Sequence, residues 1–372
     1  MAFGPETFPG ISAVRTGNPK HASIPGNEKD LFLKVFSGEV LTTFSRANLM
    51  RDLQTMRTIS SGKSAQFPAT GLAAAVYHTV GENILDDGAT TGGTDIEYLT
   101  TQNPPGSGGT QAQGGIAGGG NYLSRIKHAE RVISVDELLI SAVFMADIDR
   151  MMNHYEERSI YSKEIGNALA RSFDKRSIRA LVMAARSAGN FEGGDGYQGH
   201  PAAAGGDTIV DSLLKTDGAA IVSALFEAAQ IFDERDVPTE DRHFLCSPQQ
   251  YYLIVQQKDV IDRDITSGTN GDFADGTVKV CAGFQLHKTN SLPSVGGTSP
   301  LLGENNTYHD AAGFADNAGV AFHTSAIGTV KLKDLSVETD RKLEYMGDLM
   351  VASYALGTGI LRPESAVELS VN

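Results

Sequence analysis

Residues 147–188 carry the longest helical pattern of this chain, and that pattern constrains the fold more than any other feature. Apolar residues such as Ile165, Leu169 and Phe173 recur at three- and four-residue steps, charged residues fill the other face, and no proline intervenes. A continuous helix of this length would span about 60 Å, which is longer than a compact domain needs. The apolar stripe drifts near Glu157–Tyr161, so a break there and a coiled coil both stay open as alternatives.

Residues 86–121 have the opposite character, because they contain eleven glycines and almost no large apolar side chain. Such a run cannot bury enough surface to offset the entropy that is lost when it is ordered alone. We expect it to be either a flexible loop or a segment that neighbouring chains order. Strand-like sequence flanks the run at residues 73–81 and 126–145, which predicts a two-armed β-hairpin with the glycine-rich run at its tip.

The other segments predict an extended arm and a mixed α/β region. Residues 1–30 are rich in Gly, Pro and small polar residues and read as an arm without a core of its own. Helical spacing follows over residues 30–57, where Ser45 could cap a short helix over residues 46–53. The second half of the chain predicts helices at 217–237 and 248–261, and strands at 241–248, 279–290, 317–328 and 328–341 (with a bulge at Asp334). Residues 348–371 predict a strand, a turn and a second strand.

The sequence Gly62-Lys63-Ser64 invites comparison with a phosphate-binding loop. That motif needs a glycine five positions before the Gly-Lys pair, so that successive main-chain N–H groups can point at the phosphates. Arg57 stands at that position, and Pro68 would break a helix that begins at Lys63. A nucleotide-binding enzyme built on these residues is therefore the remote alternative, and an exposed lysine in an extended segment is the preferred interpretation.

Composition and the remaining motifs argue against a catalytic, metal-binding or membrane protein. The net charge is −14, of which residues 191–280 contribute −10, and no basic stripe supports tight DNA binding. Apolar runs are far shorter than the roughly 20 residues that span a bilayer. Cys246 and Cys281 are too few for a disulfide framework or a Cys-rich metal site, so we expect buried thiols in a reducing compartment. Asn305-Asn306-Thr307 matches a glycosylation acceptor only formally. We expect no enzyme and no cofactor.

Six segments stand out, in this order along the chain: RTISSGKSAQFPATG (57–71), GENILDD (81–87), IKHAERVISVDELL (126–139), DIDRMMNHYEERSIYSKEIGNALA (147–170), AFHTSAIGTVKLKDLSVE (321–338) and YALGTGILRPESAV (354–367). Together they closely resemble the major capsid proteins of T7-like short-tailed bacteriophages, the podoviruses. The resemblance runs from about residue 45 to the end of the chain. One departure is the tip of the hairpin, since the family joins the second and third segments through a few residues and this chain places residues 88–125 between them.

The resemblance implies an α+β chain with the HK97-like phage capsid fold. That fold consists of an N-terminal arm, an extended β-hairpin loop, a peripheral domain with a long spine helix, and an axial α/β domain. The expected boundaries are 1–50 for the arm, 51–135 for the extended loop with the insertion 86–121, 136–205 for the peripheral domain, 206–327 for the axial domain, and 328–372 for the strands that return to the peripheral domain and the C-terminal segment to the axial domain.

By the same resemblance the chain is a major capsid protein that assembles in the host cytoplasm into the hexamers and pentamers of an icosahedral virion shell around double-stranded DNA. Implied partners are further copies of itself, a scaffolding protein, a portal and a decoration protein, with no membrane and no tight sequence-specific DNA contact. Candidate contacts between subunits are Lys63, Gln66, Phe67 and Pro68, without a covalent crosslink, and Ile165, Leu169 and Phe173 pack the spine helix. The alternative within the same fold is an encapsulin-type compartment that packages an enzyme.

Overall fold

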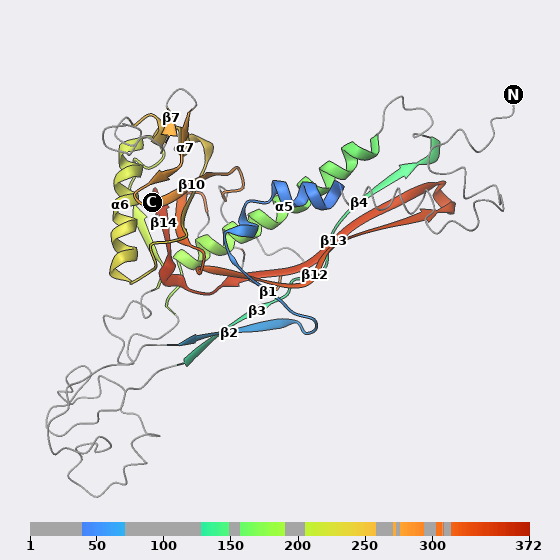
Figure 1. Ribbon diagram of the computed structural model, residues 1–372, viewed down its shortest axis with the longest axis horizontal. Helices are drawn as coiled ribbons and strands as arrows, with labels where there is room; N and C mark the ends of the chain where they lie inside the picture. The colour runs from blue at the N-terminus through green and yellow to red at the C-terminus, as the bar shows by residue number, and fades with distance from the viewer. Residues whose placement is uncertain are drawn as a thin grey trace, which may run out of the picture.

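The computed structural model describes residues 39–70, 128–148, 157–189, 205–257, 271–272, 276–293, 303–306, 308 and 314–372. Within these residues an elongated body and a more compact body lie end to end, and a hairpin projects beside them (Figure 1). Helices, antiparallel strands and parallel strands occur together, which confirms the α+β class. The predictions for the arm 1–30 and for the glycine-rich run 86–121 lie outside the described residues.

A four-stranded sheet, which we call the long sheet, extends through the elongated body. Its order is β1 (Thr55–Thr58), β12 (Ile327–Lys342), β13 (Gly347–Ile360) and β4 (Leu139–Ala146). Strands β12 and β13 are antiparallel and meet at the short helix η4 (Leu343–Tyr345), whereas β1 runs parallel to β12. The β12–β13 register shifts on either side of Lys333, so the bulge predicted at Asp334 is confirmed.

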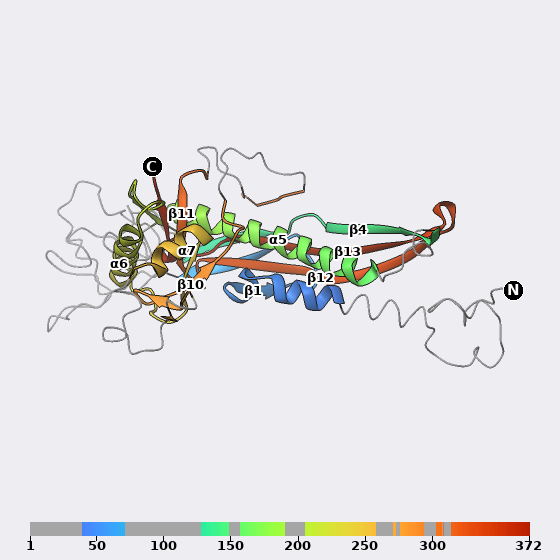
Figure 2. The same cartoon turned by 90° about the horizontal axis from the view of Figure 1, so that it is seen from above.

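Helix α5 (Glu157–Ala185) lies along one face of the long sheet in both views (Figures 1 and 2). The predicted apolar stripe is the reason, because a helix that buries one side against a sheet needs apolar residues at three- and four-residue steps. Residues 147–148 are also helical, and residues 149–156, where the predicted helix continues, lie outside the described residues. Ahead of α5 in the chain, helical residues 39–47 and η2 (Met50–Asp52) pack against the same core.

The compact body is built on a six-stranded sheet. Its order is β5 (Asp207–Val210), β14 (Ala366–Ser370), β11 (Asn317–His323), β6 (Arg242–Cys246), β10 (Phe284–Lys288) and β9 (Val280–Cys281). Helices α6 (Gly218–Glu234) and α7 (Pro248–Val255) share a core with one face, where Phe232 and Phe284 meet edge to face at 5.6 Å. Leu245 and Phe322 face the other way, into the core that contains α5. The sheet is therefore covered on both faces, and every residue of β6 is buried.

Two predicted elements differ from the structure. Ser45 lies inside the helical residues 39–47 instead of capping a helix that follows it, because the helical spacing begins earlier in the chain. The strand predicted at 279–290 is a hairpin of β9 and β10, turning at Ala282 and Gly283, which have φ values of 50° and 83°. A two-residue turn with two positive φ values matches the twist of the strands. The sequence does not show this turn clearly, because alanine stands at the first position, where Asn, Asp or Gly is usual. A short two-stranded sheet of β7 (Gly271–Asp272) and β8 (Thr277–Val278) completes the compact body.

Candidate functional site, the projecting hairpin and its root

Strands β2 (Ser64–Thr70) and β3 (His128–Ser134) form the arms of the projecting hairpin and pair antiparallel from Ser64↔Ser134 to Thr70↔His128. Strand β3 falls within the predicted arm 126–145, its partner is residues 64–70, and the other predicted arm, 73–81, lies outside the described residues. The arms form a two-stranded sheet of their own, while residues 55–58 belong to the long sheet. In Figure 1 the arms point away from α5 and the long sheet. An isolated two-stranded sheet has marginal stability in water, so this hairpin depends on contacts beyond its own pairing.

The two faces of the hairpin have different surroundings. Ala65 and Ile133 are opposite each other and buried against the long sheet, in a small core with Val330 and Ala355. The next pair along, Gln66 and Val132, has the opposite orientation and is exposed.

The predicted contact residues divide between these two faces. Gln66 and Pro68 lie at alternate positions of β2 and are exposed, whereas Phe67 is half-buried with the guanidinium of Arg57 5.5 Å from its ring centre. Arg57 also donates a hydrogen bond to the carbonyl of Gln66 at 2.6 Å. Lys63 is exposed, and its carbonyl accepts a hydrogen bond from the Val135 amide at 2.7 Å.

A cavity of about 340 Å³ lies where the hairpin approaches the body. Its lining combines hairpin residues with residues near the end of β13 and carries two arginines: Thr55, Phe67, Pro68, Ala69, Arg131, Ser325, Leu361 and Arg362. Phe67 therefore faces its own subunit, and the exposed face of Gln66, Pro68 and Val132 is the part of the hairpin that can reach another molecule.

The root of the hairpin crosses the long sheet at two glycines. A Cβ atom on Gly357 would lie 2.0 Å from the carbonyl oxygen of Ser134, and one on Gly359 would lie 2.8 Å from the side chain of Ile133. Real Cβ atoms do not approach other atoms so closely, so only glycine allows β3 to pass over β13 here. The main-chain amide of Asp136 then donates to the carbonyl of Leu356 at 3.2 Å.

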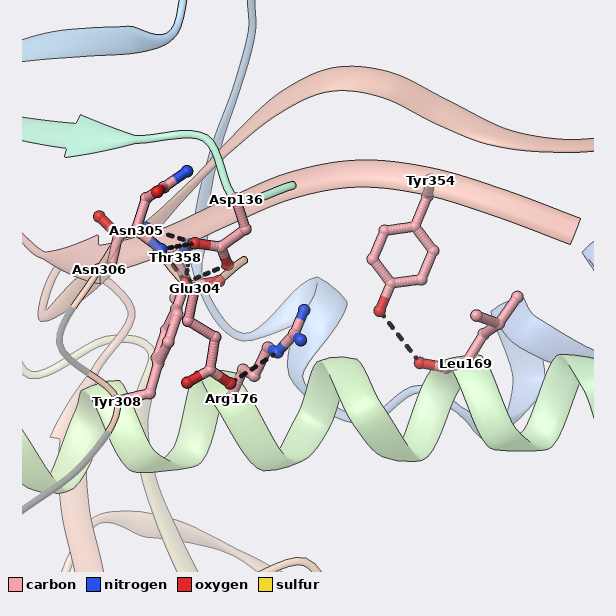
Figure 3. A network of polar contacts seen from close by, with 9 residues as sticks. All are labelled: Asp136, Leu169, Arg176, Glu304, Asn305, Asn306, Tyr308, Tyr354 and Thr358. Carbon is pink, nitrogen blue, oxygen red and sulfur yellow. Dashed lines mark hydrogen bonds and ion pairs between the residues drawn. The ribbon is translucent and has the colours of Figure 1, made fainter. Parts of the chain in front are cut away.

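The side chains of Asn305, Asn306 and Tyr308 hold the root from another side (Figure 3). The amide group of Asn306 accepts from the Ser134 N–H at 3.1 Å and donates to the Ser134 carbonyl at 2.6 Å. The Asn306 side chain thus makes the two hydrogen bonds to the main chain of Ser134, one accepted and one donated, that a residue of a neighbouring strand would otherwise make. Asn305 donates from its side chain to the Val135 carbonyl at 2.6 Å.

The carboxylate of Asp136 is the centre of this polar cluster and is 5% exposed. It accepts hydrogen bonds from the main-chain N–H of Asn305 at 2.9 Å and from the Tyr308 hydroxyl at 2.9 Å. That hydroxyl in turn accepts from the main-chain N–H of Thr358 at 2.7 Å. Burial raises the pKa of Asp136, and these hydrogen bonds act in the opposite direction. Nearby, Arg176 of α5 forms an ion pair with Glu304 at 3.5 Å. The cluster therefore joins the hairpin root, β13 and α5.

The three predicted packing residues of α5 lie together in the core that α5 shares with the long sheet. Ile165, Leu169 and Phe173 are 2%, 2% and 3% exposed. The hydroxyl of Tyr354 in β13 donates to the Leu169 carbonyl at 3.3 Å (Figure 3), which ties the middle of α5 to the long sheet.

The geometry around Gly62-Lys63-Ser64 does not form a phosphate-binding loop. Gly62 has a φ of 104° and turns the chain, but Ser64 then begins strand β2 where the motif requires a helix. Among the described residues no group of three or more His, Cys, Asp or Glu side chains could hold a metal ion. No helix in the described part of the chain is long and apolar enough to cross a membrane. Both cysteines are buried and unpaired, as predicted.

Reasoning from the sequence alone missed the residues that hold the root. Asn305 and Asn306 stood out only as part of a formal glycosylation acceptor, and they lie about 170 positions from Ser134 and Val135. Their one available signal was composition, since two adjacent asparagines suit a segment that makes side-chain hydrogen bonds in place of secondary structure.

Comparisons with known proteins support one family. The family model described as Gp10A-like, major capsid protein, matches residues 110–370. The major capsid protein of Escherichia phage T7 is 31% identical over 371 residues, covering 96% of each chain, so the similarity also reaches into residues 1–45. The capsid of cyanophage P-SCSP1u has 38% identity and a TM-score of 0.68, covering 94% of this chain and 95% of that one. The mature capsid of bacteriophage PhiM1 shares the fold, with 17% identity, a TM-score of 0.63 and coverage of 87% of each chain.

Proposed function

The chain belongs to the Gp10A-like family of major capsid proteins, and on that premise we propose that it builds an icosahedral shell of hexamers and pentamers around double-stranded DNA. It has the HK97-like capsid fold, it assembles with copies of itself into a shell, and it is located in the virion as the capsid. Its family consists of structural proteins and not of enzymes. The symmetry of the shell and the nature of its contents are the parts that we propose.

The observation that supports this proposal most is the projecting hairpin. Its arms pair only with each other among the described strands, and its outer face exposes Val132, which is 55% exposed, next to Gln66. Apolar surface on an extended element is stabilised when a second molecule covers it. We propose that Gln66 and Pro68 on this face, with Lys63 at the adjacent turn, contact a neighbouring subunit in the shell.

The charge of the chain supports its proposed relation to the contents. A net charge of −14 repels nucleic acid, and without a basic stripe the chain gains little from releasing counterions around DNA. Such a wall encloses DNA without binding it tightly. We further propose that a scaffolding protein and a portal direct assembly in the host cytoplasm, and that a decoration protein binds the finished shell.

Expression of the full chain with its neighbouring genes, followed by cryo-electron microscopy, tests this proposal. We expect closed shells with fivefold vertices and sixfold positions, and DNA inside shells that are purified from infected cells. Shells that contain a packaged enzyme and no DNA would support the encapsulin-type alternative instead. Open sheets, tubes or unassembled subunits in the presence of all neighbouring gene products would contradict the icosahedral assignment.

A further inference from the structure

We infer that Asn306, Asp136 and Tyr308 are positioning residues that set the direction in which the hairpin leaves the body. These three side chains, called the root clamp below, form no part of the exposed hairpin face. The inference deepens the proposed function and rests on it, because a subunit in a regular shell must present its hairpin to its neighbour at a reproducible angle.

The direction of the hairpin depends on a short stretch of chain. Beyond Ile133 the arms have no described strand beside them except each other, so the angle is determined by contacts at the root together with those of Arg57 to Gln66 and Phe67. Residues 134–136 pass between β13 on one side and residues 303–306 and 308 on the other. Gly357 limits how far the root can move toward β13, because the Ser134 carbonyl oxygen already occupies the space that a Cβ atom would fill at this position.

The root clamp limits movement in the other direction. Asn306 makes two hydrogen bonds to the main chain of Ser134, which are lost together if the hairpin swings away from residues 303–308. Tyr308 is 1% exposed and joins Asp136 to the Thr358 amide, so the same movement would leave buried polar groups without partners. Leaving such groups unsatisfied is unfavourable, which gives the observed angle a distinct minimum in free energy.

The residues of the root clamp come from two segments that are far apart in the chain. Asn306 and Tyr308 lie in the chain between β10 and β11, two strands of the six-stranded sheet. Asp136 lies between β3 of the hairpin and β4 of the long sheet. Three parts of the molecule therefore meet at one buried cluster.

The test is hydrogen–deuterium exchange on unassembled, full-length subunits, read by mass spectrometry over residues 64–70 and 128–135. We expect Asn306→Ala to speed exchange of these amides by about tenfold, as the loss of a buried hydrogen-bonded group implies. Asn306→Asp is the second variant, since it keeps the size of the side chain but cannot donate to the Ser134 carbonyl. It should give the same acceleration without leaving a cavity.

Asn317→Ala is the matched control. Asn317 is also a buried asparagine, 4% exposed, and its side chain donates to Glu368 at 2.7 Å in the six-stranded sheet, away from the hairpin. This variant should speed exchange in β11 and β14 and leave the hairpin amides unchanged. Unchanged hairpin exchange in both Asn306 variants, or equal acceleration of the hairpin in Asn317→Ala, would overturn the inference.

Electron microscopy of shells provides a second readout. We expect Asn306→Ala to broaden the distribution of shell diameters or to produce open assemblies, while Asn317→Ala gives shells of wild-type diameter. Shells of uniform, wild-type diameter from Asn306→Ala would contradict a positioning role. If the wild-type chain itself forms no shells, the proposed function fails, and the exchange measurement still decides whether the root clamp holds the hairpin.

Discussion

His243 and His287 lie on neighbouring strands of the six-stranded sheet, with Nδ1 of the first 3.2 Å from Nε2 of the second. The pKa of His243 is lowered from its ordinary value of 6.5 to about 4, first by burial and then by the adjacent His287, while Asp241 acts in the opposite direction. Burial also lowers the pKa of His287. One ring can donate to the other only while at least one of them is neutral, so acid should disrupt the pair.

The sign of the pH effect follows from proton binding. Between about pH 6.5 and pH 4 the unfolded chain protonates His243 and the folded chain does not, so the free energy of unfolding decreases as the pH falls through this window. The stabilisation is fully present above pH 6.5. Buried Asp136 and Asp174 have raised pKa values, which act in the opposite direction, so the wild-type melting temperature alone does not isolate the histidine effect.

We therefore predict that His243→Gln reduces the dependence of the melting temperature on pH. Thermal unfolding of unassembled subunits at pH 7.5 and pH 5 should show a smaller decrease for the variant than for the wild type. His287→Gln should behave similarly, and the double variant should add little because the two rings act as a pair. An identical decrease in all four proteins would exclude the pair as a source of acid sensitivity.

At the scale of single elements, an aspartate introduced into the hairpin and one introduced into α5 should have separable effects. Val132 is 55% exposed on the outer face of the hairpin, and Leu169 is 2% exposed in the core beneath α5. We predict that Val132→Asp leaves the melting temperature of subunits within about 1 °C of wild type, as for most exposed substitutions, but prevents shell formation. Leu169→Asp should abolish both the cooperative melting of the subunit and shell formation, since it buries an unpaired carboxylate at a cost of several kcal/mol.

Melting curves of subunits and electron microscopy of assemblies measure the two effects independently. Glu130→Asp, a change on an exposed residue of β3 that keeps the charge, is the control for Val132→Asp and should leave both readouts unchanged. Normal shells from Val132→Asp would show that the outer face of the hairpin makes no essential contact. A folded, assembling Leu169→Asp variant would contradict the packing of α5 on the long sheet.

Elements with a regular local pattern are the ones that the sequence predicts well. Helix α6 has an apolar stripe and begins behind Asp217, whose side chain accepts from the Ala219 amide at 2.9 Å. Such signals lie within a few residues of each other. The parallel pairing of β1 with β12 joins residues about 270 positions apart, and TMRT offers no alternation of burial, since all four residues of β1 are exposed. Pairings of this kind depend on the whole fold, so no local sequence pattern predicts them.

The same distinction applies to the candidate site. The strand pattern over residues 126–145 predicted the arm that contains β3, and the family resemblance placed Gln66 and Pro68 in the extended loop. They did not predict that Phe67 faces its own subunit, because a strand's period assigns residues to two faces without saying which face is covered. The root clamp could not be predicted from the sequence either, because its residues are joined by long-range hydrogen bonds and not by a motif.

At the scale of the whole molecule, an ion pair near the end of α5 connects the elongated body to the compact body. Arg186, just beyond the end of α5, donates from Nε and Nη2 to the two carboxylate oxygens of Glu368 in β14, at 2.5 and 2.7 Å. The side chain of Glu368 is fully buried, and that of Arg186 is 23% exposed and lies over the ring of Phe314. Two parallel charge-assisted hydrogen bonds hold both the distance and the orientation of the groups, so the end of α5 is held against the six-stranded sheet.

We predict that Glu368→Gln destabilises the subunit by about 3 kcal/mol, because removing one partner of a buried pair leaves the other charge poorly compensated. Calorimetry of unassembled subunits should show a lower melting temperature and, since the variant weakens the connection between the bodies, a broader transition that resolves into two. Glu164→Gln is the matched control, because Glu164 pairs with Arg171 on the exposed side of α5, where both side chains are more than 60% exposed. Exposed pairs contribute little, so this variant should melt as the wild type does. A single sharp transition at the wild-type temperature in Glu368→Gln would mean that the two bodies are coupled without the Arg186–Glu368 pair.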